Sequence, residues 1–120
     1  MEKKFEEEYQ VLEENKELSE KIREYLISEK VDPRLKGFNY FVDLVTILLF
    51  KKKYSMSFMK STYPFTAHKY NIKVHSVQRQ LRYTFTIAND RGLKPEEVYK
   101  KIWYMFKNDE LVVEKRKEER

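Results

Sequence analysis

The sequence predicts an all-α domain, and two observations lead to this fold class. Only two glycines and three prolines interrupt the 120 residues. Along most of the chain, apolar residues recur at intervals of three or four, which is the spacing of one face of an α-helix. A chain of this length forms one domain with a modest core, and its eighteen Phe, Tyr and Trp residues are expected to fill that core.

Residues 2–29 are predicted to form one charged helix, whose glutamate-rich first turns suit the positive end of the helix dipole. Val11, Leu18, Ile22 and Tyr25, with Asn15 between them, follow a 4-3-4-3 spacing. Such a helix either packs onto the domain or projects into solvent, or it forms a short coiled coil or dimerisation arm with Asn15 at a seam position. Fewer than three heptads do not decide between these alternatives, so residues 1–29 are set apart as a dimerisation or partner arm.

The segment that follows the arm is predicted to contain a central helix and a short one. The N-terminal helix is predicted to end before Val31, Asp32 and Pro33, because the residue before a proline disfavours α geometry. A helix over about 37–52 is apolar on more than half of its circumference, which is typical of a core helix. It ends in lysines at 51–53 that either complement the helix dipole or contact phosphate. Ser57 is predicted to cap a short helix that runs to Thr62.

Three residues between 65 and 92 have the spacing of a helix-turn-helix. Ala67 is small enough for two helices to approach closely, and Asn71, four residues later, tolerates the positive φ of a tight turn. Val77, six residues further on, is β-branched and can pack back onto the first helix. In this motif the second helix enters the DNA major groove. Many helical hairpins meet the pattern by chance, so more evidence is needed.

The second helix of this motif, predicted over 74–89, has one apolar and one basic face. The residues predicted to be buried are Val74, Val77, Leu81, Phe85 and Ala88. The opposite face carries His75, Ser76, Gln78, Arg79, Arg82 and Tyr83. Arginine pairs with guanine, glutamine with adenine, and serine with bases or phosphate. An ordinary solvated face would also carry acidic residues, but none lies between Lys69 and Asn89, which favours a polyanionic partner.

The positive charge of the chain is concentrated around this motif. Residues 1–30 hold 10 acidic and 6 basic side chains, whereas residues 31–94 hold 3 acidic and 12 basic ones. This distribution is typical of binding dominated by phosphate contacts. The residues predicted to read bases are His75, Ser76, Gln78 and Arg79. The residues predicted to hold phosphates are Lys51, Lys52, Lys53, Lys60, Lys69, Lys73 and Arg82.

A last helix is predicted after Gly92, which ends the preceding one. Pro95 stands at its first position and two glutamates follow in its first turn. Its apolar face is predicted to consist of Val98, Ile102, Trp103 and Phe106. Residues 30–107 are thus expected to form the effector domain, and the charged tail, 108–120, is expected to be frayed.

Several classes of function have no support in the sequence. The chain has no cysteine, which excludes a disulfide framework and a thiolate metal site. No apolar run approaches the roughly 20 residues of a membrane span, and the acidic N-terminus does not resemble a signal peptide, so we expect a cytoplasmic protein. His68 and His75 lack a carboxylate at a metal-site spacing, and no cofactor is expected. Without a nucleophile–base pair or a phosphate loop, the sequence does not predict an enzyme.

A longer set of residues carries a family resemblance. From Leu35 to Gly92 the match needs no gap, and its matching residues are Leu35, Lys36, Gly37, Phe38, Tyr40, Lys60, Tyr63, Pro64, Ala67, Lys69, Tyr70, Asn71, Val77, Arg79, Arg82, Ala88, Arg91 and Gly92. Through them the span from about Ile27 to Gly92 resembles the C-terminal DNA-binding effector domain of the sporulation-initiation response regulator, the stage zero sporulation protein A family. This set is far more specific than the bare turn pattern.

The resemblance implies a six-helix domain that binds promoter boxes in double-stranded DNA, commonly as paired copies, and that contacts RNA polymerase. The family reads bases through an Arg-x-Glu-Arg arrangement, whose positions here are Ser76, Gln78 and Arg79. Only Arg79 is kept, so a different DNA box is expected. Residues 1–29 have no room for the family's receiver domain and do not resemble a linker, which favours a stand-alone effector.

Two hypotheses from different classes follow. The leading one is a sequence-specific regulator of transcription that reads double-stranded DNA with helix 74–89. The alternative is a protein-interaction module or antagonist, which keeps the fold but has lost specific DNA reading. The changes at Ser76 and Gln78 motivate this alternative. A third class, nonspecific nucleic-acid binding, would show a steep salt dependence without sequence preference.

Overall fold

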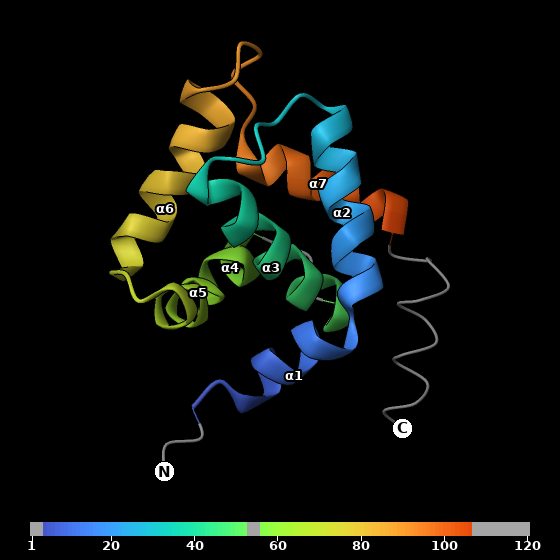
Figure 1. Ribbon diagram of the computed structural model, residues 1–120, viewed down its shortest axis with the longest axis vertical. Helices are drawn as coiled ribbons and strands as arrows, with labels where there is room; N and C mark the ends of the chain where they lie inside the picture. The colour runs from blue at the N-terminus through green and yellow to red at the C-terminus, as the bar shows by residue number, and fades with distance from the viewer. Residues whose placement is uncertain (1–3, 53–55, 107–120) are drawn as a thin grey trace.

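The helix α3 (Lys36–Phe50) lies at the centre of the molecule and the other helices pack around it (Figure 1). In the computed structural model, residues 4–52 and 56–106 are described, and every element in these ranges is helical. The elements are α1 (Glu6–Glu14), α2 (Lys16–Ser28), α3, α4 (Met56–Ser61), α5 (Tyr63–Tyr70), α6 (Val74–Arg82), a π-helical turn η1 (Tyr83–Ile87) and α7 (Pro95–Phe106). The predicted all-α fold class is confirmed.

The prediction that α3 is the core helix is also confirmed. All of its residues from Tyr40 to Phe50 are buried. A helix that is apolar around most of its circumference gains free energy only if other elements cover all its sides. The α3 helix is covered by α1, α2, α4, α5, α6, η1 and α7.

The single N-terminal helix predicted over 2–29 is wrong, because Asn15 divides it into α1 and α2. The Asn15 backbone leaves helical geometry at φ −126° and ψ 38°. Its side-chain Nδ2 donates to the Val11 carbonyl at 2.7 Å, and its own carbonyl accepts the first bond of α2 from the Ser19 N–H at 3.0 Å. Asparagine side chains compete for backbone hydrogen bonds in this way and interrupt helices.

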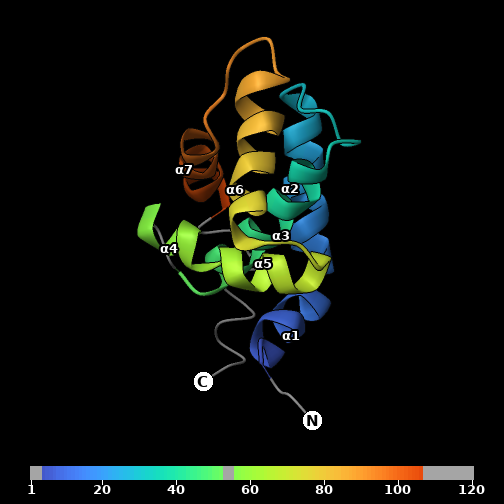
Figure 2. The same cartoon turned by 90° about the vertical axis from the view of Figure 1, so that its left-hand side faces the viewer.

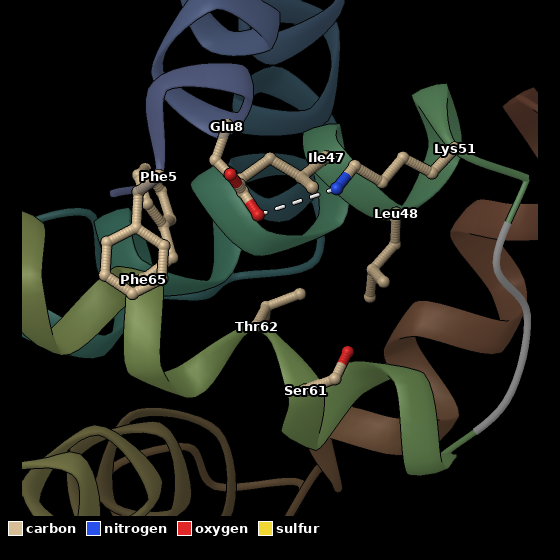
Figure 3. A pocket seen from close by; sticks show the side chains of 8 residues that line it. All are labelled: Phe5, Glu8, Ile47, Leu48, Lys51, Ser61, Thr62 and Phe65. Carbon is tan, nitrogen blue, oxygen red and sulfur yellow. Dashed lines mark ion pairs between the residues drawn. The ribbon is translucent and has the colours of Figure 1, made fainter. Parts of the chain in front are cut away.

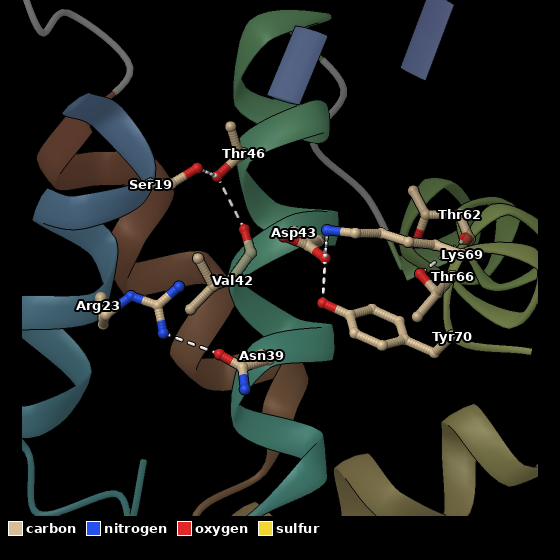
Figure 4. A network of polar contacts seen from close by, with 10 residues as sticks. All are labelled: Ser19, Arg23, Asn39, Val42, Asp43, Thr46, Thr62, Thr66, Lys69 and Tyr70. Atoms are coloured by element: carbon tan, nitrogen blue, oxygen red, sulfur yellow. Dashed lines mark hydrogen bonds and ion pairs between the residues drawn. The ribbon is translucent and has the colours of Figure 1, made fainter. Parts of the chain in front are cut away.

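The helix α2 belongs to the main hydrophobic core. Leu18, Ile22 and Leu26 are almost completely buried against α3. Polar contacts join the same two helices, since Ser19 Oγ lies 2.9 Å from Thr46 Oγ1 and Arg23 Nη1 donates to Asn39 Oδ1 at 2.8 Å (Figure 4). Of the two alternatives for this part of the predicted arm, the structure therefore shows packing onto the domain.

The helix α1 packs separately, in a smaller apolar cluster. Val11 contacts Ile47 and Phe50 of α3 and Phe65 of α5, and Phe5 and Leu12 border the cluster. Figure 1 shows α1 beneath α5 and the C-terminal end of α3, at the end of the molecule opposite the α6–α7 connection. The two N-terminal helices thus differ in their packing: α2 belongs to the main hydrophobic core, and α1 belongs to a smaller, separate cluster.

The remaining helices follow the prediction with small differences in their bounds. The short helix α4 begins at Met56, so Ser57 lies inside it rather than at the predicted cap position. Pro64 and Pro95 stand in the first turns of α5 and α7, as predicted. The buried face of α7 consists of Pro95, Val98, Tyr99, Ile102 and Phe106, whereas Trp103 is half-buried. The tail 108–120 lies outside the described residues.

Candidate nucleic-acid interface

The helices α5 and α6 are joined by a tight turn at Asn71. The Asn71 backbone is left-handed, with φ 53° and ψ 53°. The N–H of Ile72 donates to the Ala67 carbonyl at 3.0 Å, which closes the end of α5 in the manner of a left-handed C-cap. Ala67 and Val77 are both buried where the helices meet. The three roles predicted for Ala67, Asn71 and Val77 are therefore confirmed.

The second helix of the pair departs from the prediction in its last turns. Regular α-helix ends at Arg82, and the chain continues to Ile87 as a π-helical turn in which the Ala88 N–H donates to the Tyr83 carbonyl at 2.7 Å. An i→i+5 bond adds one residue to the turn and rotates the following side chains. For this reason Ala88, predicted to be in the buried stripe, is exposed, whereas Thr84, three residues after Leu81, is buried.

The apolar stripe of α6 is otherwise only partly as predicted. Val77, Leu81 and Phe85 are buried, but the side chain of Val74 is 47% exposed. Val74 is the first residue of the helix. Figure 2, which views the molecule from the side of α6, shows α6 beginning next to α5.

The outward face of α6 carries the predicted base-reading residues. His75, Gln78 and Arg79 are exposed and Ser76 is half-buried. Among the described residues, no side-chain hydrogen bond or ion pair engages any of these four. Arg82 is exposed one turn after Gln78 and Arg79. The face thus presents polar and basic groups that are not committed to the fold.

The predicted phosphate-holding residues are only partly brought together. Lys73 lies next to the base-reading residues at the N-cap of α6, without a side-chain cap bond, and Lys60 is exposed on α4. Lys51 and Lys52 follow the C-terminal end of α3, which Figure 1 places well away from α6. Lys53 lies outside the described residues.

Two of these lysines have carboxylate partners within the domain. Lys69 Nζ lies 2.6 Å from Asp43 Oδ2, which also accepts a hydrogen bond from the Tyr70 hydroxyl at 2.5 Å (Figure 4). Lys51 Nζ lies 3.5 Å from Glu7 and 3.5 Å from Glu8. Lys69 therefore fastens α5 to α3, and Lys51 fastens α1 to α3.

The Asp43 contact also sets the protonation of Tyr70. Burial raises the pKa of the Tyr70 hydroxyl far above its usual range, and the charge of Asp43 and its hydrogen bond raise it further. The hydroxyl therefore stays protonated and keeps donating to Asp43. This polar contact holds the C-terminal turn of α5, from which the Asn71 turn leads directly to α6.

A shallow pocket of about 310 Å³ lies beside α6. One of the basic side chains that line it, Lys94, was not among the predicted phosphate-holding residues. Gln78 and Arg82 line it from α6, and Lys94 lines it from the residue before α7. Glu96 lies on the same rim, so the pocket is not uniformly basic. Only the position of Lys94 just before the Pro95 helix start was visible in the sequence, and it does not reveal proximity to α6.

The described residues hold no cluster of three His, Cys, Asp or Glu side chains that could bind a metal. No described helix is long and apolar enough to cross a membrane.

Comparison with known proteins identifies the family. Residues 22–116 match the family described as sporulation initiation factor Spo0A, C terminal. No curated protein and no solved structure gives a significant match. The family is a helical DNA-binding domain rather than an enzyme family, and its match covers the second half of α2 and all of α3–α7. The chain therefore belongs to the Spo0A C-terminal family, the DNA-binding effector domain of sporulation regulators.

Proposed function

We propose that this protein is a sequence-specific regulator of transcription in which α5 and α6 act as a helix-turn-helix and α6 reads the major groove of double-stranded DNA. Membership of the DNA-binding family supports this function at the coarse level. RNA polymerase and a second copy on the promoter are further partners that the family resemblance suggests.

The observation that carries the proposal is the outward face of α6. His75, Gln78 and Arg79 project from the first two turns, which are the turns that reach base edges in this motif. A side chain that is held by no neighbour in the described part of the domain can adopt the geometry that a base pair requires. Arg79 is the residue best suited to bidentate pairing with guanine, and Gln78 to pairing with adenine.

Phosphate contacts would come from cations beside this face. Lys73 and Arg82 flank the base-reading residues on α6, and Lys94, just before α7, lines the same pocket as Gln78 and Arg82. Lys60, also in the predicted phosphate set, is exposed on α4. Lys51 and Lys69 are weaker members of the predicted phosphate set, because each would first have to leave its carboxylate partner. We therefore assign the main electrostatic contribution to Lys73 and Arg82.

The first experiment is a selection of bound duplexes from random DNA, followed by titration of the winning and a scrambled sequence at physiological salt. We expect discrimination of about 10³ or more, as is usual for specific operators. Equal, salt-sensitive binding to both duplexes would reduce α6 to a phosphate-binding surface. Binding to neither would favour the protein-interaction module.

Replacing Arg79 by alanine is expected to weaken binding to the selected duplex by about 1–3 kcal/mol, which is roughly five- to 150-fold. The base preference at one position of the site should relax at the same time. Fluorescence anisotropy with the selected duplex and its single-base variants measures both effects.

Lys16→Ala is the matched control for Arg79→Ala, because it also removes one exposed positive charge but lies at the start of α2. It should leave affinity and base preference nearly unchanged. If Arg79→Ala weakened the selected and the scrambled duplex equally, its assignment to base reading would be wrong.

Arg82→Ala is expected to weaken binding to all duplexes by a similar factor. It should also reduce the slope of log affinity against log salt by about 1, because one fewer counterion is released from the DNA. Titrations at several salt concentrations measure this slope. A loss of affinity with an unchanged slope would place Arg82 outside the phosphate contacts.

A further inference from the structure

The helix α1 occupies a distinct apolar seat, formed by Ile47 and Phe50 of α3 and Phe65 of α5. Aromatic rings of α1 border it, with the Tyr9 and Phe65 ring centroids 4.9 Å apart and those of Phe5 and Phe65 5.7 Å apart. Without α1 these large side chains would lie at the surface. Covering the seat with an apolar helix face is therefore favourable.

The attachment of α1 to this seat is lighter than that of the other N-terminal helix. Val11 is its only buried residue within Glu6–Glu14, whereas α2 buries three. A cavity of about 150 Å³ remains between α1, α3 and the α4–α5 junction (Figure 3). The Lys51 pairs with Glu7 and Glu8 are partly solvated and so contribute little.

The start of α1 adds strain. Phe5, which precedes the helix, has a left-handed backbone with φ 67° and makes no side-chain cap bond. A bulky residue in this region is an outlier that the surrounding contacts must hold in place. Segments with few buried contacts open first, and α1 is such a segment.

A single residue, Asn15, joins α1 to α2. The apolar spacing of Val11, Leu18 and Ile22 continues through it, so straightening at Asn15 would produce one helix over residues 6–28. That helix would be roughly 35 Å long and would carry α1 away from its own seat. The nearest surface of matching shape and charge is then the same seat on a second copy, and short hinges are known to favour such exchange.

We propose that a second copy of this chain is a partner, bound by reciprocal exchange of α1. Each copy straightens at Asn15 and places its Val11 in the partner's apolar seat. Glu7 and Glu8 then pair with Lys51 of the other copy. The contacts between α1 and the apolar seat are the same as in the monomer described above, but in the exchanged dimer they join two chains. This proposal does not depend on DNA reading by α6, because the seat and the outward face of α6 are separate surfaces.

Charge reversal tests the exchange directly. One variant carries Lys51→Glu, and the other carries Glu7→Lys together with Glu8→Lys. In each variant alone, the side chains at positions 7 and 8 have the same charge as the side chain at position 51. In a swapped heterodimer both seats regain opposite charges. After the two variants are refolded together, native mass spectrometry should show heterodimers several-fold above the statistical mixture. Monomers alone, or dimers without this bias, would overturn the proposal.

The matched control reverses an ion pair that stays within one chain in both forms. Lys16 Nζ lies 3.2 Å from Glu13 Oε1 across the hinge. Mixing Lys16→Glu with Glu13→Lys should therefore give no excess of heterodimer. An equal excess here would show that nonspecific charge attraction, rather than α1 exchange, produces the bias.

Hinge variants provide a second, independent readout. Asn15→Leu removes the side chain that breaks the helix and should raise the dimer fraction. Insertion of four Gly and Ser residues between Glu14 and Asn15 should lower it, because a longer hinge lets α1 close onto its own seat. Analytical ultracentrifugation measures both. The same dimer fraction in both variants would contradict the exchange mechanism.

Discussion

Replacing Phe85 by alanine is expected to lower the free energy of unfolding by about 3–5 kcal/mol. Phe85 is fully buried in the π-helical turn, and its ring centroid lies 4.5 Å from that of Phe41 on α3. Its removal leaves a cavity between the π-helical turn after α6 and the central helix α3, and two crossing helices cannot close such a cavity without moving. Chemical denaturation followed by circular dichroism measures the loss.

Ile87→Ala is the control for Phe85→Ala. Ile87 lies two residues further along the same turn and its side chain is 62% exposed. Its truncation should change stability by no more than about 0.5 kcal/mol. Equal effects of the two substitutions would show that Phe85 does not anchor the turn. Under conditions in which the Phe85→Ala protein remains folded, its loss of DNA-binding free energy should be smaller than its loss of unfolding free energy.

Replacing Gly37 by alanine is expected to cost about 3 kcal/mol, although alanine is the better helix former by about 1 kcal/mol. Gly37 lies in the first turn of α3, where α6 crosses it. A Cβ at this position would overlap the Gln80 carbonyl and the Thr84 hydroxyl. The backbone of α6 would have to move outward, and the Val77–Leu81–Phe85 stripe would lose contact with the core. Thermal and chemical denaturation measure this cost.

A double-mutant cycle separates the two contacts of the added methyl group. The Thr84 hydroxyl is buried and, among the described residues, has no hydrogen-bond partner. Thr84→Ala removes both the overlap and this unsatisfied group, so it should restore part of the stability of Gly37→Ala. Full restoration is not expected, because the Gln80 carbonyl remains. Lys36→Ala, exposed in the same turn, is the control, and a Gly37→Ala protein as stable as this control would contradict the close crossing.

Both substitutions act on the seating of α6 against α3, which positions the proposed reading surface. The residues that face outward, such as Gln78 and Arg79, are arranged by those that face inward one or two positions away. A helix shift that moved Arg79 away from a base edge would remove the gain of bidentate pairing. We therefore expect core variants at this crossing to reduce specificity before they abolish nonspecific binding.

Much of the fold could be predicted because its signals are local. The α3 helix is apolar on nearly all sides, and only a central position removes all of its apolar surface from water. Ala67, Asn71 and Val77 specify a close approach, a left-handed turn and a packing contact within eleven residues. The proline signals at Pro64 and Pro95 also act on their own backbone, and the structure confirms both. Gly92 has a left-handed backbone, but the helix that it was predicted to end already stops at Ile87.

The errors arose where distant residues decide the local geometry. Ala88 is exposed because a π-helical turn precedes it, and this turn lies against Gly37, more than forty positions earlier in the chain. Asn15, expected inside one helix over 2–29, instead ends α1. The ion pairs of Lys69 with Asp43 and of Lys51 with glutamates of α1 also depend on distant residues. That these two lysines hold phosphate stays a prediction.

The sequence by itself determined the helical fold class, the central position of α3, the α5–turn–α6 unit and its acid-free outward face. These depend on spacings of three and four residues and on single turn residues, which act between neighbours in the chain. Only the tertiary structure decided which of the predicted phosphate-holding lysines have a carboxylate partner among the described residues. It also decided where the α-helix of α6 gives way to a π-helical turn, and that α1 packs in an apolar cluster separate from the main core. Those features depend on how helices cross, and crossings bring together side chains whose separation along the chain carries no periodic signal.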